Sequence, residues 1–289
     1  MQKSKPKKKV RKGVKQHKPG LEERMVPHPI DESALNLPEK KFIGKTIFIS
    51  GGDSGIGRAV AIAFAMQGAN IAISFLPGEK PDALITKEKI ENFGQECLLL
   101  PGNIAGEQHC KKIISATHKT FGSLDVLINN AGIHSPQESI MEISAKQLKK
   151  TFETNVFSMF YLVKAALRFM KEGSCIINTA SVTAYRGSAH LLDYSATKGA
   201  IVSFTRSLSA SLAEKKIRVN AVAPGPVWTP LIASSMPPKE IATFGTDTPI
   251  GRAAQPFEMA SSYIFLASPE SLFINGQVLH PNGGEIING

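Results

Sequence analysis

Tyr194 and Lys198 stand four residues apart in the segment YSATK. Residues at this spacing share one face of a helix, so both side chains can reach the same site. A free tyrosine has a pKa of about 10, and a neighbouring ammonium group favours the phenolate. The pair is therefore a candidate acid/base, in which Lys198 is expected to lower the pKa of Tyr194. A tyrosine and a lysine on the surface of a helix can have the same spacing, so other residues must decide whether this pair is catalytic.

Two further polar side chains could join this site. Ser181 follows the apolar run 175–178, from which its hydroxyl could reach the Tyr194 phenol and polarise a carbonyl group. Asn155 lies between Phe152 and Phe157 in a long helix-like stretch and could hold a water that relays protons to Lys198. A buried asparagine bonded to the backbone is the competing interpretation.

A glycine-rich turn, SGGDSGIG, carries Gly51, Gly52, Gly55 and Gly57 between an apolar run and a helix-like stretch. The missing side chains let the backbone approach a pyrophosphate, whose charge meets free N–H groups and the positive end of the helix dipole. Taken alone, such a turn is also a common tight connection. Its position between a strand and a helix favours nucleotide binding.

The second strand should end near 75, where an acidic residue would bind the adenosine ribose and a basic one would bind a 2′-phosphate. Glu79 and Lys80 lie slightly beyond that position. Either side chain could make the contact with the ribose or its 2′-phosphate, or both could face solvent. The choice between NAD and NADP therefore stays open.

Apolar runs alternate with longer amphipathic stretches along the chain. The runs predict strands at 46–50, 70–75, 97–100, 124–129, 175–178, 217–222 and 277–280. The stretches predict helices at 57–67, 82–93, 106–121, 145–170, 192–213 and 256–267. The segment 224–250 is dense in Pro, Ser and Thr, as in a loop or lid. This βαβ alternation predicts an α/β fold, a doubly wound parallel sheet of the Rossmann type in a single domain.

The charge of the chain is concentrated at its start. The net charge is +10, and nine Lys and Arg residues lie within the first 18 residues, which contain no Asp or Glu. The rest is nearly neutral, so a nucleic-acid-binding core is not indicated. Residues 1–40 are expected to form a basic, Pro-rich extension, disordered or loosely draped, ahead of a domain at 41–289.

The sequence gives little support to several other classes of protein. No apolar run suits a secretory signal or a membrane-spanning helix, so a cytoplasmic location is expected. Cys97, Cys110 and Cys175 are isolated, which indicates neither a disulfide framework nor a metal site. The lysines of the extension could bind nucleic acid or an anionic membrane. A solubilising role is favoured, because the extension has no aromatic residue and no apolar helical face.

Together these residues resemble the short-chain dehydrogenase/reductase family from about Phe42 to the C-terminus. SGGDSGIG resembles its cofactor turn, Asn129–Gly132 its NNAG element, and Pro224–Thr229 its PG segment. Asn155, Ser181, Tyr194 and Lys198 match the catalytic tetrad of the family in order and spacing. The segment KPGLEERMVPHP and the surroundings of Trp228 further resemble a bacterial sub-group of general stress proteins and uncharacterised oxidoreductases.

The resemblance implies an NAD- or NADP-dependent oxidoreductase that transfers a hydride between nicotinamide and a carbonyl or secondary alcohol, assembled as a homotetramer. Its implied cofactor contacts are Gly51, Asp53, Ser54, Gly55, Ile56, Gly57, Asn103, Ile104, Asn130, Ala131, Gly132, Tyr194, Lys198, Pro224, Gly225, Val227 and Thr229. Small-molecule substrate contacts are expected from Thr183–Leu192, His134 and the loop after Trp228.

Two residues depart from the family pattern. Ser50 replaces a threonine and Asn103 replaces an aspartate, and both keep hydrogen-bonding capacity. A rival hypothesis is a nucleotide-sensing or scaffold protein that kept the fold without turnover. The intact tetrad argues against this rival.

Overall fold

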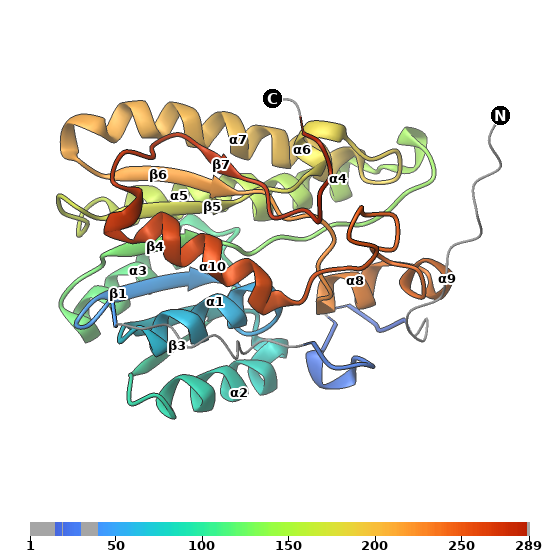
Figure 1. Ribbon diagram of the computed structural model, residues 1–289. Helices are drawn as coiled ribbons and strands as arrows, with labels where there is room; N and C mark the ends of the chain where they lie inside the picture. The colour runs from blue at the N-terminus through green and yellow to red at the C-terminus, as the bar shows by residue number, and fades with distance from the viewer. Residues whose placement is uncertain (1–14, 19, 30–39, 288–289) are drawn as a thin grey trace.

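Parallel strands and covering helices alternate along the chain and build one seven-stranded sheet (Figure 1). The computed structural model describes residues 15–18, 20–29 and 40–287. The strands are β1 (Thr46–Ser50), β2 (Asn70–Phe75), β3 (Cys97–Pro101), β4 (Val126–Asn129), β5 (Cys175–Thr179), β6 (Arg218–Val222) and β7 (Val278–Leu279). Their order in the sheet is β3-β2-β1-β4-β5-β6-β7, and every pair is parallel.

The chain reverses its direction of travel across the sheet between β1 and β4. After β3 it returns to the other side of β1 and continues outward through β4, β5 and β6. A crevice opens outside the carboxyl ends of the strands at such a point, and ligands of this fold class bind there. The predicted doubly wound Rossmann-type sheet is confirmed.

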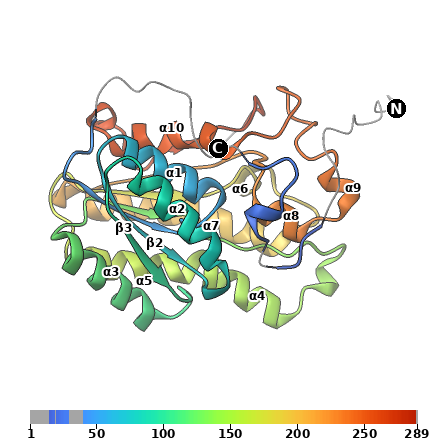
Figure 2. The ribbon, with the colours of Figure 1, turned by 90° about the horizontal axis from the view of Figure 1, so that it is seen from below.

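The helices lie on both faces of the sheet. They are α1 (Gly55–Met66), α2 (Lys80–Glu91), α3 (Glu107–Phe121), α4 (Ala145–Phe152), α5 (Ser158–Ala166), α6 (Thr183–Arg186), α7 (Leu192–Leu212), α8 (Pro230–Ser235), α9 (Pro238–Ile241) and α10 (Pro256–Ala267). Figure 2 shows α1, α2 and α10 on one side of the strands and α3 and α5 on the other.

The core has two layers because the central strands, such as β1, bury both of their faces. In β1, Ile47 and Ile49 pack with residues of α1 and α10, whereas Phe48 packs with residues of α3 and α5. A strand buried on both faces is apolar throughout, which explains the uninterrupted hydrophobic runs of the sequence.

Two regions differ from the predicted elements. The single helix expected at 145–170 ends at Ala166 and contains a π-helical segment, η4 (Glu153–Phe157), centred on Asn155. The predicted loop after Pro224 contains α8 and α9, each opening with a proline in its first turn. Proline is favoured there because the backbone N–H group that it lacks would find no acceptor inside the helix.

Part of the N-terminal extension packs on the domain. Its described residues include η1 (Glu22–Arg24), a short 3-10 helix, and lie beside α8 in both ribbon views (Figures 1 and 2). Met25 is buried with Trp228 and Ile232, and the Trp228 Nε1 donates to the Pro27 carbonyl, 2.8 Å away. These contacts hold residues 15–18 and 20–29 of the extension on the domain. Residues 1–14, 19 and 30–39 of the expected extension lie outside the described residues.

Candidate active site

The site lies at the carboxyl ends of the central strands, where the turns after β1 and β4 meet. The Ser50 hydroxyl accepts hydrogen bonds from the backbone N–H groups of Asn130 (3.0 Å) and Ala131 (3.1 Å). The Asn130 side-chain amide donates to the carbonyl groups of Ser50 and Gly51. Ser50, one of the two departures from the family pattern, therefore ties the two turns together.

The glycine turn forms a cradle that side chains would fill. Gly51 and Gly55 adopt φ angles of +62° and +53°, a left-handed conformation that favours glycine. A Cβ atom on Gly57 would overlap the Gly51 carbonyl oxygen. A Cβ atom on Gly55 would lie 3.1 Å from the side chain of Thr229, which brings the PG segment against this turn. The cradle at the start of α1 therefore fits a pyrophosphate group.

Acidic groups line the side of the turn that faces β2. Asp53 is buried, and loss of water together with the charge of Glu79 raises its pKa to about 8. The Glu79 carboxylate folds back to accept from the Leu76 N–H group at 2.8 Å. Ser54 precedes the first residue of α1, and Ile56 is packed against the core. Glu79 thus lies near the turn and caps its own backbone, and Lys80 is exposed.

The remaining predicted cofactor residues surround the same edge. Asn103 follows β3 and accepts from the Ala105 N–H group, whereas Ile104 is buried. A Cβ atom on Gly225 would lie 2.7 Å from the Asn282 Cα atom, so the PG segment runs close to the C-terminal loop. Val227 pairs with Ala254 in a parallel bridge, and Pro224 accepts a hydrogen bond from the Val182 N–H group.

Three members of the predicted tetrad come together beside this cradle. The Ser181 side chain lies near enough to the Tyr194 hydroxyl to lower its pKa, and the Lys198 Nζ atom lies 5.3 Å from the centroid of the Tyr194 ring. Lys198 is buried and donates to the Thr179 carbonyl at 2.7 Å. One turn of α7 and the end of β5 therefore deliver a phenol, a hydroxyl and an ammonium group to one place.

The ionisation of the pair differs from the expectation. Burial raises the pKa of the Tyr194 phenol to about 12, and the hydrogen bond to Ser181 opposes this rise. Burial also lowers the pKa of Lys198 to about 7. The expected lowering of the Tyr194 pKa by Lys198 is not seen, because the burial that brings the two groups together disfavours the charged form of both.

Asn155 lies next to Lys198, with both of its donor hydrogens used. Its Nδ2 atom donates to the Ile133 carbonyl (2.9 Å) and to the Thr197 hydroxyl (3.1 Å). Its Oδ1 atom accepts from the Ile133 N–H group. A Cβ atom on Gly132 would lie 3.5 Å from Asn155 Oδ1 and 3.6 Å from Lys198 Nζ. A relay through a water can therefore use only the second lone pair of Oδ1.

His134 forms the wall opposite Tyr194. Its ring packs edge-on against the Tyr194 ring, with centroids 5.2 Å apart. The Ser235 hydroxyl of α8 donates to the Leu231 carbonyl and lies 2.5 Å from His134 Nε2. Because that hydroxyl hydrogen is used, His134 Nε2 carries a hydrogen and donates to Ser235. Burial lowers the pKa of His134 to about 4, so the ring is neutral at pH 7.

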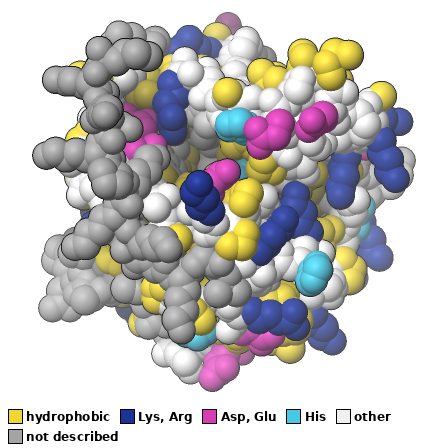
Figure 3. All heavy atoms as spheres, turned by 90° about the vertical axis from the view of Figure 1, so that its right-hand side faces the viewer, with side chains coloured by type: hydrophobic (Ala, Val, Ile, Leu, Met, Phe, Trp, Pro, Cys, Tyr) yellow, Lys and Arg dark blue, Asp and Glu magenta, His cyan; other side chains and the backbone are white. Residues whose placement is uncertain are grey.

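Figure 3 looks onto this edge of the molecule, where basic, acidic and hydrophobic side chains surround a hollow in the described surface. Thr183 is buried at the start of α6, and Leu192 is exposed at the start of α7. Both elements adjoin the tetrad in the chain. The segments predicted to contact substrate therefore lie beside the reacting groups.

Four residues of the site were not identified from the sequence. Thr179 and Thr197 hold Lys198 and Asn155, and Arg58 and Glu22 brace the glycine turn. Arg58 directly follows the glycine motif, and this position could have identified it from the sequence. Glu22 lies in a segment noted only for its resemblance, and no local pattern pairs it with α1.

Other chemistries have less support within the residues that the structure describes. Cys97, Cys110 and Cys175 are buried free thiols whose pKa burial raises to about 12. No group of three or more His, Cys, Asp or Glu side chains is arranged for a metal ion in the described ranges. No helix there is long and apolar enough to span a membrane.

The family model described as enoyl-(acyl carrier protein) reductase matches residues 51–285. This match covers the turn, the tetrad and the PG segment described above. The chain belongs to the short-chain dehydrogenase/reductase family. The resemblance stated from the motifs is confirmed, and so is the coarser conclusion that the chain is an oxidoreductase of this family with a nicotinamide cofactor, NAD or NADP.

Relatives of this short-chain dehydrogenase/reductase span nearly the whole chain. The uncharacterized oxidoreductase YhdF of Bacillus subtilis is 53% identical over 93% of both chains. General stress protein 39 of the same organism is 49% identical over 93% of this chain and 94% of its own. The chloroplastic NADPH-dependent aldehyde reductase 1 of Arabidopsis thaliana is 49% identical over 95% of this chain and 98% of its own.

Solved structures share the fold. A short chain dehydrogenase from Burkholderia cenocepacia in complex with NADP is 27% identical, with a TM-score of 0.79 over 84% of this chain and 98% of its own. A 3-ketoacyl-(acyl-carrier-protein) reductase from Brucella melitensis complexed with NADH is 31% identical, with a TM-score of 0.76 over the same shares. Neighbours of the fold are therefore found with the phosphorylated and the unphosphorylated cofactor.

Proposed function

We propose that the protein transfers a hydride between a nicotinamide cofactor and a carbonyl or secondary alcohol substrate. One observation carries this proposal: the Tyr194 phenol lies beside the Ser181 side chain and buried Lys198, at the edge of the sheet that holds the glycine cradle. A protein that only binds a nucleotide has no use for a phenol and a hydroxyl placed to act on a carbonyl oxygen.

The residues divide the chemistry among them. The bound nicotinamide supplies or accepts the hydride. Ser181 donates a hydrogen bond to the carbonyl oxygen, and Tyr194 gives its phenolic proton to the oxygen as negative charge develops there. Lys198, held by the Thr179 carbonyl, binds the ribose hydroxyls and returns a proton towards Tyr194. In the oxidation direction the same groups act in reverse.

The cofactor lies, in this proposal, along the carboxyl edge of the sheet. The turn residues from Gly51 to Gly57 take the pyrophosphate and the adenosine ribose. Asn103 and Ile104 take the adenine side, and Asn130–Gly132 line the middle of the cleft. Val227 and Thr229 would hold the carboxamide, as the resemblance to the family implies. A Cβ atom on Gly55 would lie 3.1 Å from the Thr229 side chain, so this segment lies beside the turn.

We infer that substrates are small aldehydes and hydroxylated carbonyl compounds. The wall opposite Tyr194 contains the buried, neutral His134, whose Nδ1 atom has no hydrogen-bond partner among the described residues. A neutral ring with Nε2–H engaged leaves Nδ1 as an acceptor, which suits a substrate hydroxyl. The aldehyde reductase activity named for the Arabidopsis relative supports the same class.

Replacement of Tyr194 by Phe tests the proposal. Loss of the proton donor is expected to lower kcat by roughly 100- to 10,000-fold on every carbonyl substrate that the wild type accepts. Binding of NAD(H) and NADP(H), followed by fluorescence, should remain. Tyr161→Phe is the matched control, because Tyr161 packs against the distant core of α3 and α5.

Activity assays on a panel of aldehydes, ketones and sugars decide between the enzyme and the rival nucleotide sensor. Turnover by the wild type and its loss in Tyr194→Phe support the enzyme. Cofactor binding with no turnover on any substrate, or near-normal turnover in the variant, contradicts the assignment of Tyr194.

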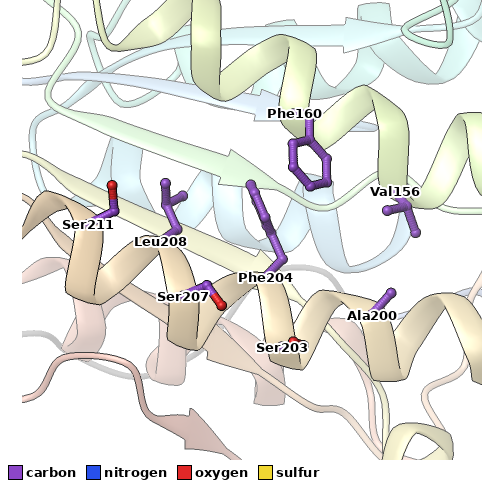
Figure 4. Close-up of a pocket in the computed structure, with 8 residues that line it drawn as sticks. All are labelled: Val156, Phe160, Ala200, Ser203, Phe204, Ser207, Leu208 and Ser211. Carbon is purple, nitrogen blue, oxygen red and sulfur yellow. The ribbon is translucent and has the colours of Figure 1, made fainter.

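We further propose that the protein assembles with copies of itself through the face formed by α5 and α7. A groove there is lined by Val156, Phe160, Ala200, Ser203, Phe204, Ser207, Leu208 and Ser211 (Figure 4). The small residues of α7 lie three or four positions apart and leave room beside Phe160, which is 46% exposed. A two-fold axis would place the Phe160 ring of each copy against the small residues of the other. The groove contains none of the four tetrad residues.

A further inference from the structure

The N-terminal extension contributes a buried carboxylate to the glycine turn. Glu22 is 4% exposed although it belongs to the basic extension. Its Oε1 atom accepts from the backbone N–H group of Gly55, 3.1 Å away, the first residue of α1. Its Oε2 atom forms an ion pair with Arg58, and its backbone N–H group donates to Asp82 Oδ2 at 3.1 Å.

Arg58 transmits this contact to the turn itself. Its Nε atom donates to the Asp53 carbonyl at 2.9 Å, and the Thr86 hydroxyl donates to the same carbonyl at 2.7 Å. Its Nη2 atom pairs with Asp82 Oδ1 at 3.0 Å. Glu22 and Asp82 therefore hold the guanidinium from two sides. The guanidinium in turn holds the backbone of the turn between Gly52 and Gly55.

We propose that Glu22 is a positioning residue of the dinucleotide-binding turn, supplied in the same chain by the N-terminal extension; this rests on the cofactor use proposed above. Glu22 keeps the Gly55 N–H group paired and Arg58 oriented, so the turn has its binding conformation before the cofactor arrives. Preorganisation of this kind raises affinity, because less ordering is left to the binding step.

A competing effect has the opposite sign. A carboxylate at the start of a helix occupies the position that favours anions, and it would repel a pyrophosphate nearby. Arg58, which also pairs with Asp82, offsets part of that charge. Positioning therefore predicts weaker cofactor binding when Glu22 is removed, and competition predicts tighter binding.

The test compares Glu22→Ala and Glu22→Gln with Glu23→Ala in the full chain. Glu23 is the neighbouring acidic residue, with a half-exposed side chain that pairs with Arg24 at 3.7 Å. Dissociation constants for NADH and NADPH are measured by fluorescence titration. Hydrogen exchange of peptides covering 51–58 is followed without cofactor, with peptides of α10 as the internal reference.

Positioning predicts for Glu22→Ala a roughly 10-fold weaker binding of the preferred cofactor, as one buried charged hydrogen bond implies. It also predicts faster exchange in 51–58 but not in α10, while kcat at saturating cofactor and the substrate KM stay near wild type. Glu22→Gln, which keeps an acceptor for Gly55, should fall between Glu22→Ala and wild type. Glu23→Ala should match wild type.

Unchanged or tighter binding in Glu22→Ala would overturn the proposal. If Glu22→Ala does not fold, wild-type values of both binding and exchange in Glu22→Gln would overturn it. A wild type that binds neither cofactor would count against the proposed function instead, and the exchange of 51–58 would still decide whether Glu22 holds the turn.

Discussion

At the scale of single residues, burial shifts the pKa values of the site towards the uncharged forms. Burial raises the pKa of Tyr194 and lowers the pKa values of Lys198 and His134. Each shift has the same cause, because the protein replaces water around the group with fewer dipoles. The protein alone therefore holds a neutral phenol ready to donate a proton, which suits reduction of a carbonyl.

His134 should make the stability of the protein depend on pH. Its pKa in the folded state is about 4, below the ordinary value of 6.5, mainly through burial and secondarily through Lys18. The unfolded chain therefore binds more protons between these values, and the folded state loses stability as the pH falls from 6.5 towards 4. At pH 5 the loss should be on the order of 2 kcal/mol.

His134→Gln provides the comparison, because glutamine does not titrate. Its free energy of unfolding in urea, measured at pH 7.5 and pH 5, should fall by less than that of the wild type. Equal losses in both proteins would show that the ring is not the responsible group.

At the scale of elements, the N-terminal extension and the segment after β6 form one unit. The Gln16 N–H group donates to the Ala233 carbonyl of α8, and Lys18 donates to the His134 carbonyl and the Ser135 hydroxyl. Lys18, one of the lysines of the extension for which the sequence favoured a solubilising role, thus forms hydrogen bonds beside the site. The extension therefore connects α8 to the loop that follows β4.

Met25→Ala should loosen this unit. Met25 is buried against Trp228 and Ile232, and truncation of a buried methionine costs about 2–5 kcal/mol. We expect a lower free energy of unfolding in urea and faster proteolysis of the extension. Val26→Ala is the control, because Val26 is 55% exposed; a loss of the same size in that variant would argue against packing as the cause.

At the scale of the whole molecule, the sheet ends at β3 and β7 and both of its faces are covered by helices. Phe157 and Phe160 leave an exposed patch on the outer face of α5 and α7 among the residues that the structure describes. Phe157 and Phe160 are exposed there to 42% and 46%. Exposed aromatic side chains beside an apolar groove are typical of protein interfaces. This face therefore suits contact with a second copy.

Phe160→Asp should reduce the assembly state. A charge buried in a self-complementary interface has no partner and faces its own copy across the two-fold axis. Light scattering should give a larger mass for the wild type than for the variant. Leu84→Asp on α2, an exposed position away from the groove, is the control. A wild type that is already monomeric would exclude this interface.

Much of the fold followed from the sequence, because apolar periodicity is a local property. β2 and α10 begin and end at the predicted residues, 70–75 and 256–267. The glycine turn and the YSATK segment were recognisable for the same reason, since their chemistry lies within a few neighbouring residues. The π-helical segment at Asn155 was missed, because its extra residue per turn leaves no mark on the hydrophobic pattern.

The residue types of the candidate site and their attachment to strand ends and helices were determined by the sequence itself. Only the tertiary structure decided the pKa shifts of Tyr194 and Lys198 and brought Glu22 to the start of α1. Burial and long-range contacts depend on which distant segments share a space. Ion pairs such as Glu22 with Arg58 join residues far apart in the chain, and no local pattern records that choice.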